Sequence, residues 1–136
     1  MTGIFAGGCL CGRVRYEAAG PALFGGLCHC RSCQRVSGGG HLPVMGVATS
    51  GMSVSGDPAR HSMAGGSGMQ THRHFCPGCG STLFGTSDSD PDLATLYVGS
   101  LDDPSVFQPS AAINARERQP WDTGGRDLHS FDGMPA

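Results

Sequence analysis

The sequence predicts a mostly β protein with few short helical turns, and three observations support that prediction. The 136 residues include 23 glycines and nine prolines, which interrupt long helices, and aromatic residues make up only 7%. Short apolar segments are separated by turn residues along the chain. Seven cysteines fall into three clusters, and metal held by such clusters can stabilise a small hydrophobic core.

The predicted elements follow one another in short steps. Residues 13–17 alternate between apolar and polar side chains, as in a half-buried strand. Residues 23–30 are expected to form a second strand, followed by a helical turn over 31–36 that ends at the glycines 38–40. Further strands are predicted at residues 41–49, 52–55, 69–75, 81–86 and 93–99.

We expect one domain over residues 1–136, because the chain has no internal repeat and no composition shift that marks a boundary. The tail over residues 122–136 is rich in glycine and aspartate with little to bury. It is therefore expected to be loosely ordered or to wrap the surface.

Charge and hydropathy exclude several classes of partner. The net charge is −2 at pH 7 with no run of like charges, so nothing indicates nucleic-acid or membrane binding. No segment reaches the roughly 18 apolar residues of a membrane span, and the start lacks a signal-peptide pattern. We therefore expect a cytoplasmic protein, in which thiols stay reduced.

All nine basic residues are arginine, and they are unevenly placed relative to the acids. Up to residue 56 the only acid is Glu17, opposed by Arg13, Arg15, Arg31 and Arg35. Arginine binds carboxylates through two parallel hydrogen bonds, so this surplus hints at an anionic ligand near the cysteine-rich half.

Four of the cysteines have the spacing of a closed structural zinc site. Cys9 and Cys11 are two residues apart and would share one face of a strand. Cys76 and Cys79 flank Pro77-Gly78, a spacing typical of a zinc knuckle. Because seven is an odd number, metal binding accounts for the cysteines better than disulfides do.

The remaining cysteines, Cys28, Cys30 and Cys33, offer three thiolates and leave no fourth cysteine. Three protein ligands with an open position are typical of a catalytic zinc, where a thiol substrate could occupy the fourth place. His29 lies between two of these cysteines, but strand alternation sends it to the opposite face. We expect it to be a packed or surface residue rather than a ligand.

Two alternatives remain open for these clusters. Cys30-Arg-Ser-Cys33 or Cys76-Pro-Gly-Cys79 could be a redox pair, although that chemistry expects a longer helix than this sequence predicts. The central cysteines could also be small buried apolar residues, although their neighbours are polar. Of the other histidines, His72 and His74 share a face of a predicted strand and could line a pocket.

Three ordered cysteine motifs make the sequence similar to a known family. It resembles the zinc-binding glutathione-dependent formaldehyde-activating family, which includes the domain of centromere protein V, over a core of about residues 7–121. The matching segments are Gly7–Tyr16, Cys28–Arg35 with Ser37-Gly38, Phe75–Ser81, Gly99–Pro104 and Pro120-Trp121.

The resemblance implies a β-tent-like fold of packed antiparallel sheets organised around zinc. It implies a structural ion on Cys9, Cys11, Cys76 and Cys79. A second, catalytic ion would be held by Cys28, Cys30 and Cys33. The founding activity of the family joins formaldehyde to glutathione as S-hydroxymethylglutathione, a reaction classed with the carbon–sulfur lyases.

The leading hypothesis is therefore a zinc-dependent carbon–sulfur lyase that acts on a glutathione-type thiol adduct. Glutathione would be the co-substrate, and Arg31 and Arg35 would meet a carboxylate of the ligand. The rival hypotheses are a non-catalytic zinc-binding module and a thiol redox sensor on the same fold. A fourth protein ligand that closes the central site would favour the module.

Overall fold

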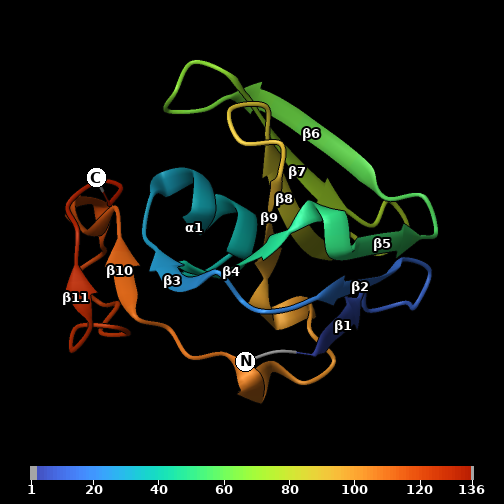
Figure 1. Cartoon of the computed structure of the whole chain (residues 1–136). Helices are drawn as coiled ribbons and strands as arrows, with labels where there is room; N and C mark the ends of the chain where they lie inside the picture. The colour runs from blue at the N-terminus through green and yellow to red at the C-terminus, as the bar shows by residue number, and fades with distance from the viewer. Residues whose placement is uncertain (1–2, 136) are drawn as a thin grey trace.

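The computed structural model describes residues 3–135 and arranges them in two β-sheets and one short α-helix (Figure 1). This architecture confirms the prediction of a mostly β fold with few short helical turns. No helix of the described residues has the length and apolar character to cross a membrane. The helix is α1 (Arg31–Ser37), and 3-10 turns occupy Thr49–Gly51, Val98–Ser100, Pro104–Val106 and Ala115–Glu117.

The smaller sheet joins the start of the chain to its middle. Its three strands are antiparallel in the order β1-β2-β5. Side chains of β2 alternate between exposed and buried, so that Tyr16 and Ala18 enter the core. The strands are β1 (Ile4–Gly8), β2 (Arg15–Ala19) and β5 (Met52–Ser55).

The larger sheet has the order β11-β10-β3-β4-β9-β8-β7-β6. The neighbouring strands in the part β3-β4-β9-β8-β7-β6 are antiparallel. At the other edge, β10 runs parallel to both β3 and β11. The expected antiparallel sheets are therefore extended at this edge by two parallel pairs. The strands are β3 (Phe24–Cys28), β4 (Leu42–Ala48), β6 (Ala59–Ala64), β7 (Gln70–Phe75), β8 (Thr82–Ser87), β9 (Leu93–Tyr97), β10 (Ala111–Ile113) and β11 (His129–Ser130).

Strands with clear apolar segments were predicted within one or two residues, and four others were missed. β6 is exposed along nearly its whole length, so it carries no apolar alternation. β1 ends in two glycines, and β10 and β11 have only three and two residues. β1 and β6 form by pairing with the next strand along the chain, whereas β10 lies beside β3, which comes much earlier in the sequence.

The core is divided into two clusters of buried side chains. The larger lies between the sheets and includes Tyr16, Leu83 and Leu96. The smaller contains Leu42, Val44 and Tyr97 together with two of the central cysteines. Part of the apolar core is thus continuous with the cysteine site.

The end of the chain is held by backbone hydrogen bonds. The Phe131 amide donates to the Ala112 carbonyl at 2.9 Å, and β11 pairs with β10. Asp122 is buried. The segment from Asp122 onward therefore has partners on β10 and at His41, and its expected loose order stays a prediction.

Candidate functional site

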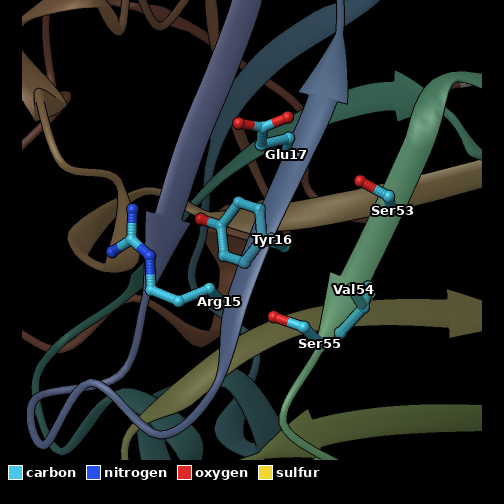
Figure 2. A pocket seen from close by; sticks show the side chains of 6 residues that line it. All are labelled: Arg15, Tyr16, Glu17, Ser53, Val54 and Ser55. Carbon is cyan, nitrogen blue, oxygen red and sulfur yellow. The ribbon is translucent and has the colours of Figure 1, made fainter.

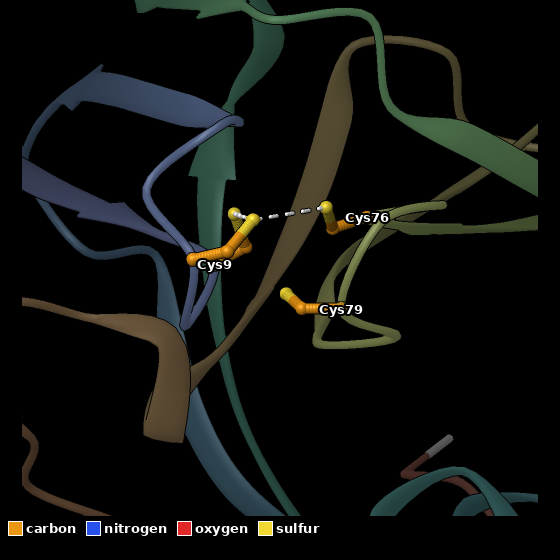
Figure 3. Close-up of side chains that lie close together, drawn as sticks. Cys9, Cys76 and Cys79 are labelled. Carbon is orange, nitrogen blue, oxygen red and sulfur yellow. Dashed lines mark hydrogen bonds between the residues drawn. The ribbon is translucent and has the colours of Figure 1, made fainter.

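Two turns that are far apart in the sequence bring four cysteines together. Cys9 and Cys11 follow β1, and Cys76 and Cys79 occupy the turn between β7 and β8. Figure 3 shows Cys9 beside Cys76 and Cys79. Their four sulfurs all lie within 4.8 Å of one another. The Cys9–Cys11 and Cys11–Cys76 sulfur distances are 3.6 and 3.8 Å. Thiolates on a tetrahedral zinc lie about 3.8 Å apart, so this donor set fits a closed zinc site.

Backbone groups in both turns orient the sulfurs. The amides of Val14 and Gly78 donate to the sulfurs of Cys9 and Cys76 at 3.2 and 3.3 Å. Gly80 has a φ of 77°, and its amide closes the turn on the Cys76 carbonyl at 2.8 Å. Amide donors favour the charged thiolate, which is the form that binds metal.

A turn, and not a strand, brings Cys9 beside Cys11. The sequence predicted that both would share one face of a strand, but β1 ends at Gly8 and both cysteines lie in the following turn. The Gly12 amide donates to the Cys9 carbonyl at 3.2 Å and closes that turn. A tight turn, like strand alternation, brings residues two apart to one side.

The central cysteines meet where a strand passes into a helix. Cys28 ends β3, Cys30 is the N-cap of α1, and Cys33 lies in the first helical turn. The Cys33 amide donates to the Cys30 sulfur at 3.3 Å, as at a helix N-cap. The three sulfurs lie within 4.8 Å of one another. The predicted strand and helical turn therefore converge on one point.

Negative charge in this group is concentrated on Cys30. Hydrogen bonds from Cys28 and Cys33 lower the pKa of the Cys30 thiol far below its usual range. The same contacts raise the pKa of the thiols of Cys28 and Cys33. Without a metal, one thiolate shared by two thiols is the favoured state.

Three further residues, which the sequence argument did not identify, surround the sulfurs. Asn114 donates its side-chain amide to the Cys28 sulfur at 3.4 Å. Arg73 contacts the Cys33 sulfur at 3.7 Å and donates to the Tyr97 hydroxyl at 3.1 Å. Burial raises the pKa of Tyr97, so its phenol stays protonated at neutral pH.

The three cysteines border a cavity of about 300 Å³. Most of its wall is apolar, and Arg73 is its one basic side chain among the residues described. Its principal lining residues are Phe24, Leu42, Val44, Arg73, Tyr97, Ile113 and Met134.

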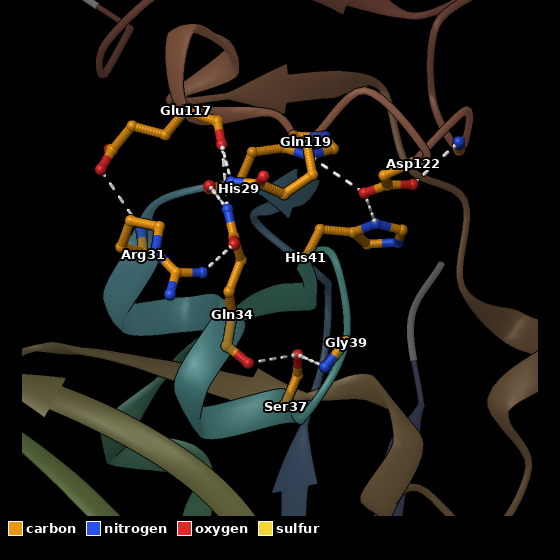
Figure 4. A network of polar contacts seen from close by, with 10 residues as sticks. His29, Arg31, Gln34, Ser37, Gly39, His41, Glu117, Gln119 and Asp122 are labelled. Atoms are coloured by element: carbon orange, nitrogen blue, oxygen red, sulfur yellow. Dashed lines mark hydrogen bonds and ion pairs between the residues drawn. The ribbon is translucent and has the colours of Figure 1, made fainter.

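Arg31 and Arg35, which were predicted to bind a carboxylate of the ligand, do not line the cysteine cavity. Both border a separate cavity beside Trp121, on the outer side of α1. Arg31 is hydrogen-bonded to Gln34 and, through its amide, to Glu117 at 3.3 Å (Figure 4). Their role as ligand contacts stays a prediction, whereas Arg73 supplies the positive charge beside the sulfurs.

The face of β7 explains why Arg73 was missed. Thr71 and Arg73 face the cysteine cavity, so the alternate residues His72 and His74 face away from it. His72 contacts Asp88 at 2.8 Å, and His74 stacks on Phe84 with ring centroids 4.3 Å apart. Alternation in the sequence separates the two faces but does not show which one meets the cysteines.

A groove on the smaller sheet lacks comparable chemistry. Figure 2 shows Arg15, Tyr16 and Glu17 of β2 beside residues of β5. The Arg15 guanidinium is paired with Asp102, which neutralises its charge, and both side chains are about half exposed. The arginine-rich character of the first half of the chain is therefore not concentrated at one site.

Comparisons with known proteins support a family assignment. The family model described as glutathione-dependent formaldehyde-activating enzyme matches residues 4–117. A search of curated proteins finds no match. Among solved structures, the chain is similar to the crystal structure of a Rhodobacter sphaeroides protein, with 20% sequence identity and a TM-score of 0.58. That alignment covers 93% of this chain and 99% of the other, and at this identity it supports the fold alone.

Proposed function

The chain belongs to the glutathione-dependent formaldehyde-activating enzyme family, and from that premise we propose that it is a carbon–sulfur lyase acting on a thiol adduct. One observation carries the proposal. The thiols of Cys28, Cys30 and Cys33 converge on the wall of a cavity that also contains Arg73. The proposal is supported by the presence of potential metal ligands, a positive charge and an apolar surface around one space.

The donor set of the central cluster fits a zinc ion with an open position. Among residues 3–135 no histidine, aspartate, glutamate or further cysteine joins the three cysteines. The nearest other groups, the Asn114 amide nitrogen and the Arg73 guanidinium, are hydrogen-bond donors that do not ligate metal. Bound zinc would lower the pKa of a substrate thiol and polarise the carbonyl group of an aldehyde. The lack of a closing ligand supports the enzyme over the non-catalytic module.

The proposed reaction is an addition without oxidation or reduction. The thiol sulfur forms a bond to the aldehyde carbon, the carbonyl π bond opens, and the thiol proton ends on the oxygen. The reverse reaction breaks the same carbon–sulfur bond. Glutathione and formaldehyde are the substrate pair that the family name suggests.

In the proposed reaction, Arg73 and Tyr97 act on the oxygen of the aldehyde. The Arg73 guanidinium can hold a substrate carboxylate or the negative charge that develops on the aldehyde oxygen. The protonated Tyr97 hydroxyl accepts a hydrogen bond from Arg73 at 3.1 Å and keeps its own proton available for donation. Leu42, Val44 and Ile113 line the same cavity and limit the access of water to the adduct.

Exchange NMR with ¹³C-labelled formaldehyde and glutathione tests the proposal, since it measures the rate of adduct formation at equilibrium. We expect the protein to accelerate exchange in a saturable manner, and Cys30→Ser to abolish the acceleration. Serine is a good N-cap, so this variant keeps the start of α1 intact. Arg60→Ala, which changes an exposed arginine on β6, is the matched control and should retain activity. No acceleration with a panel of thiols and aldehydes, from protein with zinc at both clusters, would overturn the proposal.

A further inference from the structure

A third group of potential metal ligands lies behind the cysteine cluster. It consists of His29 from the β3–α1 connection, His41 just before β4, and Asp122 from the C-terminal segment. One ligand atom from each lies within 4.8 Å of the others. Figure 4 shows the three side chains directed toward one another. No part of the proposed thiol chemistry uses them.

His29 has no hydrogen-bond partner for its ring within the described residues. Its side chain is fully buried, and neither Nδ1 nor Nε2 makes a hydrogen bond in residues 3–135. A buried imidazole that makes no hydrogen bond loses hydration, and the Asp122 carboxylate, 3.4 Å from its Nδ1, compensates for that loss only in part. The cost is removed if one nitrogen ligates a metal ion.

The carboxylate of Asp122 lies between the two imidazoles. Its Oδ2 atom is 2.7 Å from Nδ1 of His41 and 3.4 Å from Nδ1 of His29. The other oxygen, Oδ1, accepts the Gly124 amide at 3.0 Å, so the carboxylate is held in place. Ligand atoms about 2.0–2.1 Å from a tetrahedral zinc lie roughly 3.3 Å apart. The distance from His29 Nδ1 to Asp122 Oδ2 matches this spacing. The distance from His41 Nδ1 to the same oxygen would have to increase by about 0.6 Å.

The local backbone makes room for this approach. A Cβ atom on Gly40 would lie 2.5 Å from Oδ2 of Asp122, so a larger residue would displace the carboxylate. His41 itself borders a cavity of about 720 Å³, which gives a path from solvent. The ring centroids of His29 and His41 are 5.1 Å apart with a tilt of 50°, so the rings do not stack face to face.

We propose that His29, His41 and Asp122 form a mononuclear divalent transition-metal site, distinct from both cysteine clusters. Two imidazoles and one carboxylate suit Zn²⁺ and leave a fourth position for water. The metal would join the C-terminal segment to the β3–α1 and β4 connections. The Arg118 guanidinium acts on His29 as a nearby positive charge. We therefore expect zinc to bind more weakly here than at the thiolates.

The test is the zinc content of the full-length protein equilibrated with micromolar free Zn²⁺. The wild type is expected to carry one zinc per chain more than His41→Ala and one more than Asp122→Asn. His61→Ala, which removes an exposed histidine on β6, is the matched control and should keep the wild-type content. Far-UV circular dichroism and retention of the cysteine-bound zinc show that the variants are folded.

A measurement on the wild type makes the test independent of variant folding. Protein with zinc on its cysteines is titrated with Co²⁺, and the visible spectrum is recorded. Weak d–d bands without a thiolate-to-cobalt charge-transfer band would support a nitrogen and oxygen site. Absence of these bands, or an equal zinc content in His41→Ala and wild type, would overturn the proposal and leave a hydrogen-bonded histidine–aspartate pair. Neither outcome depends on lyase activity.

Discussion

Arg73 links the apolar cavity to the central sulfurs, and its replacement is the most direct test of the site at the scale of one residue. Arg73→Ala removes the hydrogen bonds to Tyr97 and Cys33 and the positive charge beside them. Charged hydrogen bonds contribute roughly 1.5–3 kcal/mol, so we expect kcat/KM for adduct formation to fall about 10- to 100-fold. Exchange NMR measures this loss.

The Arg73→Lys variant distinguishes charge from geometry. Lysine keeps the charge but lacks the planar fork, so it should restore only part of the activity. Arg60→Ala controls for the loss of a neighbouring arginine, since Arg60 lies on the adjacent strand opposite His74. Full activity in Arg73→Ala would show that the guanidinium has no part in the reaction.

Tyr16 gives the protein a pH dependence on the alkaline side. Its ring is buried between the sheets, and burial raises the pKa of its hydroxyl to about 12, against about 10 in the unfolded chain. The unfolded state therefore releases this proton first as pH rises. The contribution of Tyr16 to stability is complete below pH 10 and is lost as pH rises from about 10 to about 12.

We expect the free energy of unfolding to decrease over this interval by at most about 1.4 kcal/mol per pH unit from this group. Urea denaturation at several pH values measures the slope. Tyr16→Phe should flatten it, at the cost of the hydrogen bond to Ser100. An unchanged slope in the variant would assign the alkaline dependence to other groups.

At the scale of elements, the turn after β5 holds the smaller sheet together. Gly56 has a φ of 90°, and a Cβ atom there would lie 1.8 Å from the Arg13 carbonyl oxygen. Both the backbone conformation and the space exclude a side chain. Gly56→Ala should therefore destabilise the protein by more than about 2 kcal/mol, as measured by urea denaturation.

Gly66 provides the matched control for this substitution. It lies in the turn between β6 and β7, and a Cβ atom there would contact nothing within 4 Å. Gly66→Ala should change the stability by less than about 1 kcal/mol. Equal effects of the two substitutions would contradict the steric explanation for Gly56.

The strands that were predicted from the sequence have an apolar pattern of their own, and the strands that were missed do not. β2, β4 and β9 carry their own apolar pattern, and local reading located them. β6 carries none, and it forms because β7 offers a free edge. A local sequence pattern likewise shows only part of the site. Cys28, Cys30 and Cys33 are close together in the sequence. Arg73 and Asn114 are distant in the sequence, and the pairing of the strands brings them beside the cysteines.

His29 shows this limit within one motif. Alternation correctly predicted that it would face away from Cys28 and Cys30. Its neighbours there, His41 and Asp122, lie 12 and 93 residues further along the sequence. No spacing rule connects them, so the third ligand group became apparent only from the folded chain.

At the scale of the whole molecule, the four-cysteine cluster connects the two sheets. Cys9 and Cys11 follow β1 of the smaller sheet, and Cys76 and Cys79 join β7 to β8 of the larger one. A zinc ion here would close a link between segments more than 60 residues apart in sequence. Structural zinc contributes folding free energy directly, so this cluster should affect stability more than the open one.

A pair of serine variants tests this difference. Cys11→Ser is expected to lower the melting temperature by more than about 10 °C, although Cys11 is exposed, because it would remove one of the four potential ligands of a zinc ion that connects the sheets. Cys30→Ser removes a ligand of the open site but keeps the helix cap, so it should lower the melting temperature by only a few degrees. Differential scanning calorimetry with a chelator titration measures both.

The chelator should take zinc from the open site first, with loss of activity before loss of fold. A larger effect of Cys30→Ser than of Cys11→Ser would reverse the assignment of structural and catalytic roles to the two clusters.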